Sequence, residues 1–160
     1  MSEDVMKTWD SMLVPFHDIL ARTKVRNYLE WGGGEYSTKW AKNCPSIFNH
    51  ITIEHDSDWF NKIDTPNKHL CDLVRHKECE YTQKPLDLDM KFDMIVVDGR
   101  NRNICLKNAL RLTSSYKSIV LLHDADRAEY WPGIQCWPHA RIYRRERTVL
   151  LRKCPFTEWT

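Results

Sequence analysis

The sequence predicts an α/β fold, with a mostly parallel central sheet, helices on both faces and a C-terminal antiparallel hairpin. Three observations predict it. Apolar runs of strand length alternate with segments of helical pattern, which is the order that builds a parallel sheet through crossover connections. Two runs, "MIVV" and "IVLL", are continuously apolar, as strands covered on both faces are. The residues near the end instead form two short strand patterns around a tight turn.

Length and composition indicate one domain over residues 1–160. The formal net charge of +2 demands neither nucleic acid nor an acidic membrane as a partner. The start of the chain lacks the pattern of a signal peptide, and no apolar run reaches the length of a membrane span, so we expect a soluble cytoplasmic protein. The six cysteines form no C-x-x-C pair and are expected to be reduced thiols.

The elements follow in chain order. Residues 1–22 are predicted to form a helical segment interrupted near Pro15, and a core over residues 25–131 follows. Short runs rich in β-branched residues and bounded by turn formers or charges predict strands at 25–31, 50–56, 69–75, 92–99 and 118–124. Helices are predicted at 37–44, 57–63 and 101–115. The last has apolar residues at three-to-four spacing: Ile104, Leu106, Ala109, Leu110 and Leu112.

Two segments stand outside this alternation. Residues 76–91 have no helical period and contain a proline, so we expect a long loop, which in a compact domain is often functional. Residues 139–154 are predicted to form an antiparallel hairpin that turns near Arg145 and Glu146. Its exposed basic side chains would discourage edge-to-edge association.

Three of the five glycines, Gly32, Gly33 and Gly34, directly follow the first predicted strand. At the carboxyl end of such a strand, glycine lets the backbone approach a ligand that a Cβ would push away. We therefore interpret this loop as a ligand cradle rather than a bare turn. A dinucleotide fingerprint would need a third spaced glycine where Ser37 stands, although Glu54 lies where a ribose contact is expected.

Several motifs together resemble those of class I S-adenosylmethionine-dependent methyltransferases, which have a Rossmann-like fold. Glu30, Gly32 and Gly34 form an acid-x-Gly-x-Gly pattern, Glu54 closes the second strand, and "FDMIVVDG" forms the fourth. The match is closest to small O-methyltransferases associated with glycan modification, which carry runs similar to "EWGGGEYST", "IEHDSDWF", "VVDGRNR" and "LLHDADR". The resemblance implies an enzyme that transfers a methyl group from S-adenosylmethionine to a hydroxyl of a sugar, a glycan or another small acceptor.

The resemblance also implies a cofactor site. Glu30 would lie near the ammonium group of the methionine moiety, Gly32–Gly34 against its carbon chain, and Glu54 at the ribose hydroxyls. Ser37 and Thr38 would bind the methionine carboxylate at a helix start, unless they are ordinary helix caps. The other predicted cofactor residues are His55, Trp59 beside the adenine or merely against the sheet, Tyr81 at the adenine rim, and Asp98.

Asp98, His123 and Asp124 follow the fourth and fifth strands and are the predicted catalytic residues. His123 could be a general base, if it lies within reach of the proton, or a buried structural histidine. Asp98 could orient the acceptor, stabilise positive charge or cap the next helix. Asp98 and Asp124 also resemble the acids that hold Mg²⁺ in metal-assisted O-methyltransferases, so a Mg²⁺ or Mn²⁺ site stays open. Those enzymes place asparagine after the second acid, where this chain has Ala125.

Arg100, Arg102 and Arg127 are predicted to grip an anionic or sugar-phosphate acceptor, unless they are solvated surface charges. The N-terminal segment, the 76–91 loop, the stretch after Arg127 or the second copy of a homodimer would complete the acceptor pocket. Nucleic acid is not an expected partner, because no aromatic-interleaved motif accompanies the arginines of the tail. The alternatives are an RNA or protein methyltransferase and a catalytically silent binding subunit with the same fold.

Overall fold

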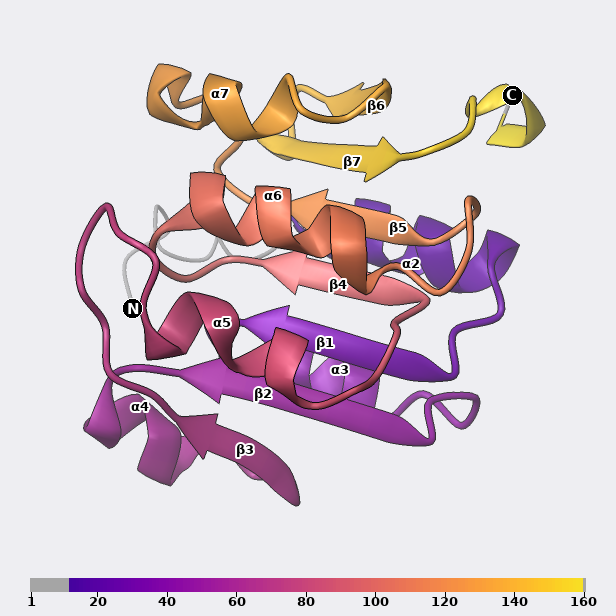
Figure 1. The fold of residues 1–160 in the computed structure, drawn as a ribbon. Helices are drawn as coiled ribbons and strands as arrows, with labels where there is room; N and C mark the ends of the chain where they lie inside the picture. Colours follow the sequence, from indigo (N-terminus) through magenta and orange to yellow (C-terminus); the bar gives the residue numbers. More distant parts are fainter. Residues whose placement is uncertain (1–11, 160) are drawn as a thin grey trace.

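A seven-stranded sheet forms the centre of the computed structural model, which describes residues 12–159 (Figure 1). Its strand order is β3-β2-β1-β4-β5-β7-β6. The first five of these strands pair in parallel, and β7 pairs antiparallel with both β5 and β6. This confirms the predicted sheet and its hairpin. The strands are β1 Asn27–Trp31, β2 Asn49–Glu54, β3 Asn67–Leu70, β4 Met94–Val97, β5 Ile119–Leu122, β6 His139–Tyr143 and β7 Thr148–Arg152.

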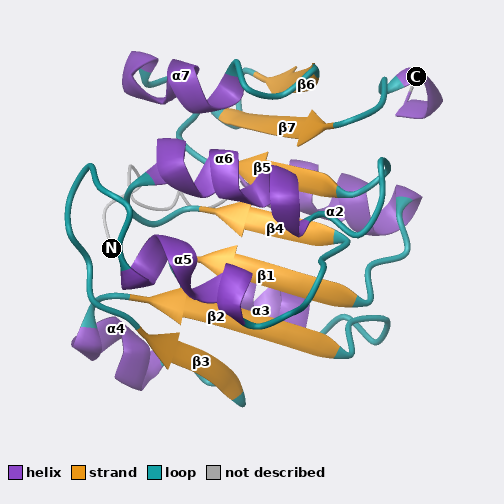
Figure 2. Cartoon of the chain, viewed as in Figure 1, coloured by secondary structure: helices purple, strands orange, loops and turns teal. Residues whose placement is uncertain are grey.

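Helices cover both faces of the sheet (Figure 2). In the view of Figures 1 and 2, α5, α6 and α7 lie in front of the sheet, and α2 and α3 lie behind it. None of the described helices is long and apolar enough to cross a membrane. The α-helices are α2 Leu13–Arg22, α3 Ser37–Lys42, α4 Ser57–Lys62, α5 Glu80–Asp87, α6 Arg102–Leu112 and α7 Trp131–Ile134, and short 3₁₀ turns span Ala128–Tyr130 and Thr157–Trp159.

The central strands contribute side chains to two hydrophobic cores, one on each face of the sheet. Ile95 and Val97 of β4 belong to the core beneath α5 and α6, whereas Met94 and Val96 belong to the core beneath α2 and α3. Successive side chains of a strand point to opposite faces, so a strand covered on both faces must be apolar throughout. This explains why the sequence of β4 has no polar alternation.

The prediction of a loop over residues 76–91 is wrong for residues 80–87, which form helix α5. Pro85 lies inside this helix and has no N–H to donate to the carbonyl of Tyr81, four residues earlier. The indole Nε1 of Trp31 in β1 donates to that carbonyl instead, at 2.9 Å. Because a side chain from the sheet replaces the lost helical bond, the proline does not break the helix.

Two other boundaries differ from the prediction. The third strand was expected over 69–75 but spans Asn67–Leu70, where the Lys68 amino group donates to the carbonyls at the end of α4. This edge strand is largely exposed, so its apolar pattern is weak. Pro15 does not interrupt α2 but lies in its first turn, where a helix does not need the missing N–H. The prediction for residues 1–11 lies outside the described residues. All six cysteines are free thiols, as expected.

Candidate active site

The functional candidates lie in one row at the carboxyl edge of the sheet. The register pairs Trp31 of β1 with Val97 of β4, and Val97 with Leu122 of β5. Backbone hydrogen bonds continue this pairing one residue further, because Asp98 N donates to the Trp31 carbonyl and His123 N to the Val97 carbonyl. The strand ends therefore bring together residues from four separate motifs: Gly32, Glu54, Asp98 and His123.

A cleft of about 290 Å³ opens beside Gly32, Glu54 and Asp98, whereas His123 and Asp124 do not line it. Arg100 and Arg102 also contribute to its lining. Of the predicted cofactor residues, four do not line it: Glu30, Ser37, Thr38 and Tyr81. The predicted cofactor residues that do line it are Gly32, Gly33, Gly34, Glu54, His55, Trp59 and Asp98.

The three glycines of the loop lie in different surroundings, so a side chain would have a different effect at each. Gly32 has a φ of +83°, and a Cβ there would lie 2.6 Å from the backbone of Gly99, so the ends of β1 and β4 pass in close contact. A Cβ at Gly33 would collide with the side chains of Thr52 and Ile63. A Cβ at Gly34 would meet nothing within 4 Å. Packing requires the first two glycines, and only the third faces open space.

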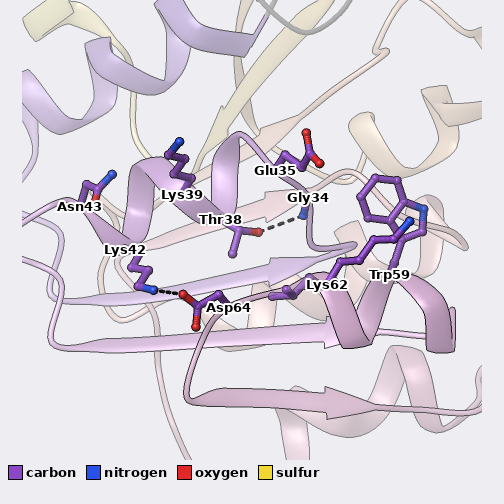
Figure 3. Close-up of a pocket in the computed structure, with 10 residues that line it drawn as sticks. Gly34, Glu35, Thr38, Lys39, Lys42, Asn43, Trp59, Lys62 and Asp64 are labelled. Carbon is purple, nitrogen blue, oxygen red and sulfur yellow. Dashed lines mark hydrogen bonds and ion pairs between the residues drawn. The ribbon is translucent and has the colours of Figure 1, made fainter.

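Glu30 lies behind the glycine loop and is fully buried. Its carboxylate is held by five side chains from β1, β2 and α3: Thr38 Oγ1 at 2.6 Å, Thr52 Oγ1 at 2.8 Å, Tyr28 Oη at 2.9 Å, Ser37 Oγ at 3.2 Å and His50 Nε2 at 3.2 Å. Thr38 Oγ1 also accepts a hydrogen bond from Gly34 N at 2.9 Å (Figure 3). Glu30 therefore fixes the loop from behind. The direct cofactor roles of Glu30, Ser37 and Thr38 stay predictions.

Glu54 joins the second strand end to the glycine loop while facing the cleft. Its Oε1 accepts hydrogen bonds from the backbone N–H groups of His55 and Asp56, at 2.8 and 3.0 Å. Its Oε2 accepts one from Gly33 N at 3.1 Å, the single partner of that oxygen in the described part of the chain. Since a carboxylate oxygen can accept two hydrogen bonds, Oε2 retains capacity for a ligand hydroxyl.

His55 provides an unsatisfied polar atom in the cleft lining. Its Nδ1 is buried and has no hydrogen-bond partner among the residues that the structure describes. It lies 3.1 Å from Glu54 Oε1 without forming a hydrogen bond. Glu54 Oε1 is its polar neighbour, and because this nitrogen is buried, it is not accessible to a ligand in the cleft.

Asp98 and His123 form a pair at the end of the row. The distance between His123 Nδ1 and Asp98 Oδ1 is 3.0 Å, and the two side chains are 12% and 24% exposed. A carboxylate at this distance orients the imidazole ring. Asp98 does not cap α6, whose N-cap residue is Asn101. The pair has the composition of a general base with its orienting acid.

Asp124 is surrounded by arginines. Arg147 Nη2 lies 3.2 Å from its carboxylate, Arg127 Nη2 at 3.6 Å and Arg102 Nη1 at 3.8 Å. The charge of Asp124 raises the pKa of Arg127. Arg147 was not predicted as a site residue. The signal was the hairpin register: because Leu122 pairs with Val149, Arg147 stands opposite Asp124.

Arg102 is buried, with its side chain only 7% exposed. Its guanidinium donates to the carbonyls of Gly99 at 3.0 Å and His123 at 2.6 Å, and it lies 5.0 Å from the ring centroid of Tyr130. It thus ties the residues after β4 to those after β5. Arg100 and Arg127, in contrast, are exposed on the rim. A role in binding the acceptor stays a prediction for all three arginines.

The residues around Asp98 and Asp124 test the predicted metal site. With His123 they could offer three ligand atoms that all lie within 4.8 Å of one another. However, three guanidinium groups already lie within 4 Å of the two carboxylates, and two of these arginines also reach Asp126 and Glu129. A divalent cation would have to displace these guanidinium groups from the carboxylate oxygens. The arginine contacts do not favour Mg²⁺ or Mn²⁺ here, and the metal site stays a prediction.

A larger groove, of about 600 Å³, adjoins the cleft between α3 and α4 (Figure 3). Gly34 and Trp59 line both cavities. Within the groove Lys42 pairs with Asp64, and the Lys62 amino group lies 5.1 Å from the ring centroid of Trp59. Trp59 is therefore a shared wall between the cleft and the groove rather than a residue packed only against the sheet.

Tyr81 packs beneath the cleft. Its burial is expected to make the folded protein less stable at alkaline pH. It is fully buried, and burial raises its pKa well above 10. Above pH 10 an unfolded chain releases this proton while the folded chain retains it, so the stability present below pH 10 is lost as the pH rises. Each such tyrosine should lower the free energy of unfolding by about 1.4 kcal/mol per pH unit there.

Urea unfolding between pH 9 and 11 measures this slope. Because burial also raises the pKa of Tyr28 and of two thiols, the difference between variants isolates Tyr81. Tyr81→Phe should reduce the slope by about 1.4 kcal/mol per pH unit above pH 10, and Tyr116→Phe, at a side chain that is 76% exposed, should not change it. An unchanged slope in Tyr81→Phe would contradict the burial of this hydroxyl.

Comparison with known proteins identifies the fold. No family model and no curated protein matches the chain. The MycE methyltransferase from the mycinamycin biosynthetic pathway, solved with Mg and SAH, superposes with a TM-score of 0.60 at 12% identity over 95% of this chain and 49% of its own. This chain thus spans about half the length of MycE.

The N-methyltransferase NodS from Bradyrhizobium japonicum WM9 superposes with a TM-score of 0.53 at 12% identity, over 95% of this chain and 97% of its own. NodS has also been solved in complex with S-adenosyl-L-homocysteine, SAH. An identity this low shows the fold and leaves the acceptor undefined. The chain has the Rossmann-like fold of the class I S-adenosylmethionine-dependent methyltransferases.

Proposed function

We propose that the protein is an S-adenosylmethionine-dependent O-methyltransferase that acts on a hydroxyl of a sugar, a glycan or another small acceptor. The observation that carries this proposal is the contact of His123 with Asp98, which lines the cleft, with 3.0 Å between Nδ1 and Oδ1. A neutral amine is nucleophilic without losing a proton, whereas a hydroxyl benefits from a base. An oriented histidine beside the cleft therefore favours an oxygen acceptor.

The residues of the cleft fit the cofactor. Gly34 offers a stretch of backbone beside open space, where a ligand can approach closely. Glu54 Oε2 can accept a hydrogen bond from a ribose hydroxyl. When bound, the cofactor would supply a methyl group on a positively charged sulfur. The carboxylate of Asp98 would stabilise this positive charge.

The work of the chain is to align the acceptor and to take its proton. With Nδ1 directed at Asp98, His123 Nε2 is the nitrogen that would accept the proton of the hydroxyl. Alignment of two reactants can supply roughly 7–11 kcal/mol of barrier reduction. General base catalysis adds a factor of about 10²–10⁴ in rate. Positioning by the cleft thus contributes more than the base.

A methyl-transfer assay tests the proposal. Protein and methyl-labelled S-adenosylmethionine are incubated with free sugars, polymeric glycans, RNA and protein, and label is expected in a sugar or glycan. His123→Ala should lower the rate by about 10²–10⁴-fold without changing SAH affinity, and His139→Ala, at the start of β6, is the matched control. Label in RNA or protein alone would contradict the acceptor class. Unchanged rates in both His123→Ala and Asp98→Ala would contradict the catalytic assignment.

A further inference from the structure

A second cavity, of about 440 Å³, adjoins the cofactor cleft at the start of α6. The two cavities share Gly99, Arg100 and Arg102. Its far side is formed by Arg75 and His76, from the segment between β3 and α5, and by Arg127, Glu129 and Tyr130. The cavity has the volume of a small-molecule site and opens onto the same rim as Asp98. Its position is that of a site for the second reactant.

The lining of this cavity is strongly basic. Four of its residues are arginines, and Glu129 is its single acidic residue. Arg102 and Arg127 are partly offset by Asp124. The guanidinium groups of Arg75 and Arg100 form no ion pair or side-chain hydrogen bond with any described residue. Two exposed arginines that have no counter-charge among the described residues therefore face a cavity lined by two further arginines.

The segment that carries Arg75 is held in place by one side chain. Asn101 Oδ1 accepts a hydrogen bond from His76 N at 2.9 Å. Asn101 Nδ2 donates to the carbonyls of Val74 at 2.8 Å and Lys77 at 3.1 Å. Both His76 and Asn101 have a positive φ, so the turn is of a kind that needs such support. Arg75 is thus presented on an ordered backbone, which reduces the ordering cost of binding.

We propose that this cavity binds an anionic oxygen group, a phosphate or a carboxylate, on the small acceptor. The inference rests on the proposed function, because it assigns the acceptor of the same site. Arginine forks match the geometry of both groups and bind them through paired, charge-assisted hydrogen bonds. Arg75 and Arg100 anchor the group, Asn101 holds the anchor, and the rest of the acceptor extends toward Asp98. An uncharged sugar has no counterpart to this surface.

The test is a calorimetric titration of the SAH-saturated protein with three matched probes: glucose, glucuronate and glucose 6-phosphate. A charged probe is expected to bind and glucose is not, and the two charged probes distinguish carboxylate from phosphate. Arg75→Gln and Arg100→Gln should each weaken that binding about 10- to 100-fold, as the loss of a charged hydrogen bond does. Asn101→Ala should weaken it without removing a charge. Arg145→Gln, on the exposed hairpin turn, is the matched control and should have no effect.

The outcomes separate this proposal from the function on which it rests. If SAH binds but neither charged probe does, or if glucose binds as well as they do, the anionic site is wrong and the cofactor site stands. If SAH displaces the charged probe from the free protein, the cavity belongs to the cofactor and the proposal is overturned. If SAH itself does not bind, the proposed function fails first. Arg75→Gln should leave SAH affinity within about twofold, because Arg75 does not line the cleft.

Discussion

Replacement of Glu30 by alanine is expected to lower the free energy of unfolding by about 3–5 kcal/mol. The carboxylate is fully buried and accepts hydrogen bonds from five side chains, two of which belong to the first turn of α3. The variant would leave these groups buried without an acceptor, and each unpaired group carries a desolvation cost. Glu30→Gln keeps one carbonyl oxygen and the side-chain shape, so its cost should be smaller, about 1–2 kcal/mol.

Equilibrium unfolding in urea measures both variants, with Glu35→Ala as the matched control. Glu35 is exposed in the same loop and should change the free energy of unfolding by less than about 0.5 kcal/mol. If Glu30→Ala cost no more than Glu35→Ala, Glu30 would not be the support of the glycine loop. Its predicted contact with the ammonium group of the cofactor would then be its better explanation.

Gly32→Ala is expected to destabilise the protein by roughly 3–5 kcal/mol, and Gly34→Ala by less than about 0.5 kcal/mol. At Gly32 a side chain would meet the Gly99 backbone at 2.6 Å in a conformation with φ of +83°, which alone costs an alanine about 1–2 kcal/mol. At Gly34 a Cβ meets nothing. Glycine to alanine at these two positions therefore distinguishes a glycine required by packing from one that faces open space.

Thermal and urea unfolding of the two variants check this contrast. If Gly32→Ala does not fold, the stability of Gly34→Ala remains a full test, because a loss above about 2 kcal/mol there would contradict the open space at this position. Equal effects at the two positions would contradict the close approach of the β1 and β4 ends.

The fold and the row of candidate residues were predictable because their signals are local. The apolar runs "MIVV" and "IVLL" mark buried strands, and the residue after each run must lie at the carboxyl edge. Parallel pairing then brings Asp98 beside His123 without any knowledge of the loops. The cleft-lining glycines and Glu54 follow from the same rule.

The features that the sequence did not predict depend on contacts between distant parts of the chain. The bond from Trp31 to the Tyr81 carbonyl, which tolerates Pro85 in α5, joins residues 50 positions apart. The burial of Glu30 needs donors from β2 as well as from β1, and Arg147 reaches Asp124 only because of the hairpin register. No local pattern marks such partners, so their roles could not be assigned from the sequence.

The cleft between the glycine loop and Asp98 is expected to hold an adenosyl thioether. Isothermal titration calorimetry of the protein with SAH and, separately, with NAD tests this expectation most directly. SAH is expected to bind, Mg²⁺ should not change its affinity, and Glu54→Gln should weaken it about 10- to 100-fold through the loss of a charged hydrogen bond. Binding of NAD without binding of SAH would contradict this expectation.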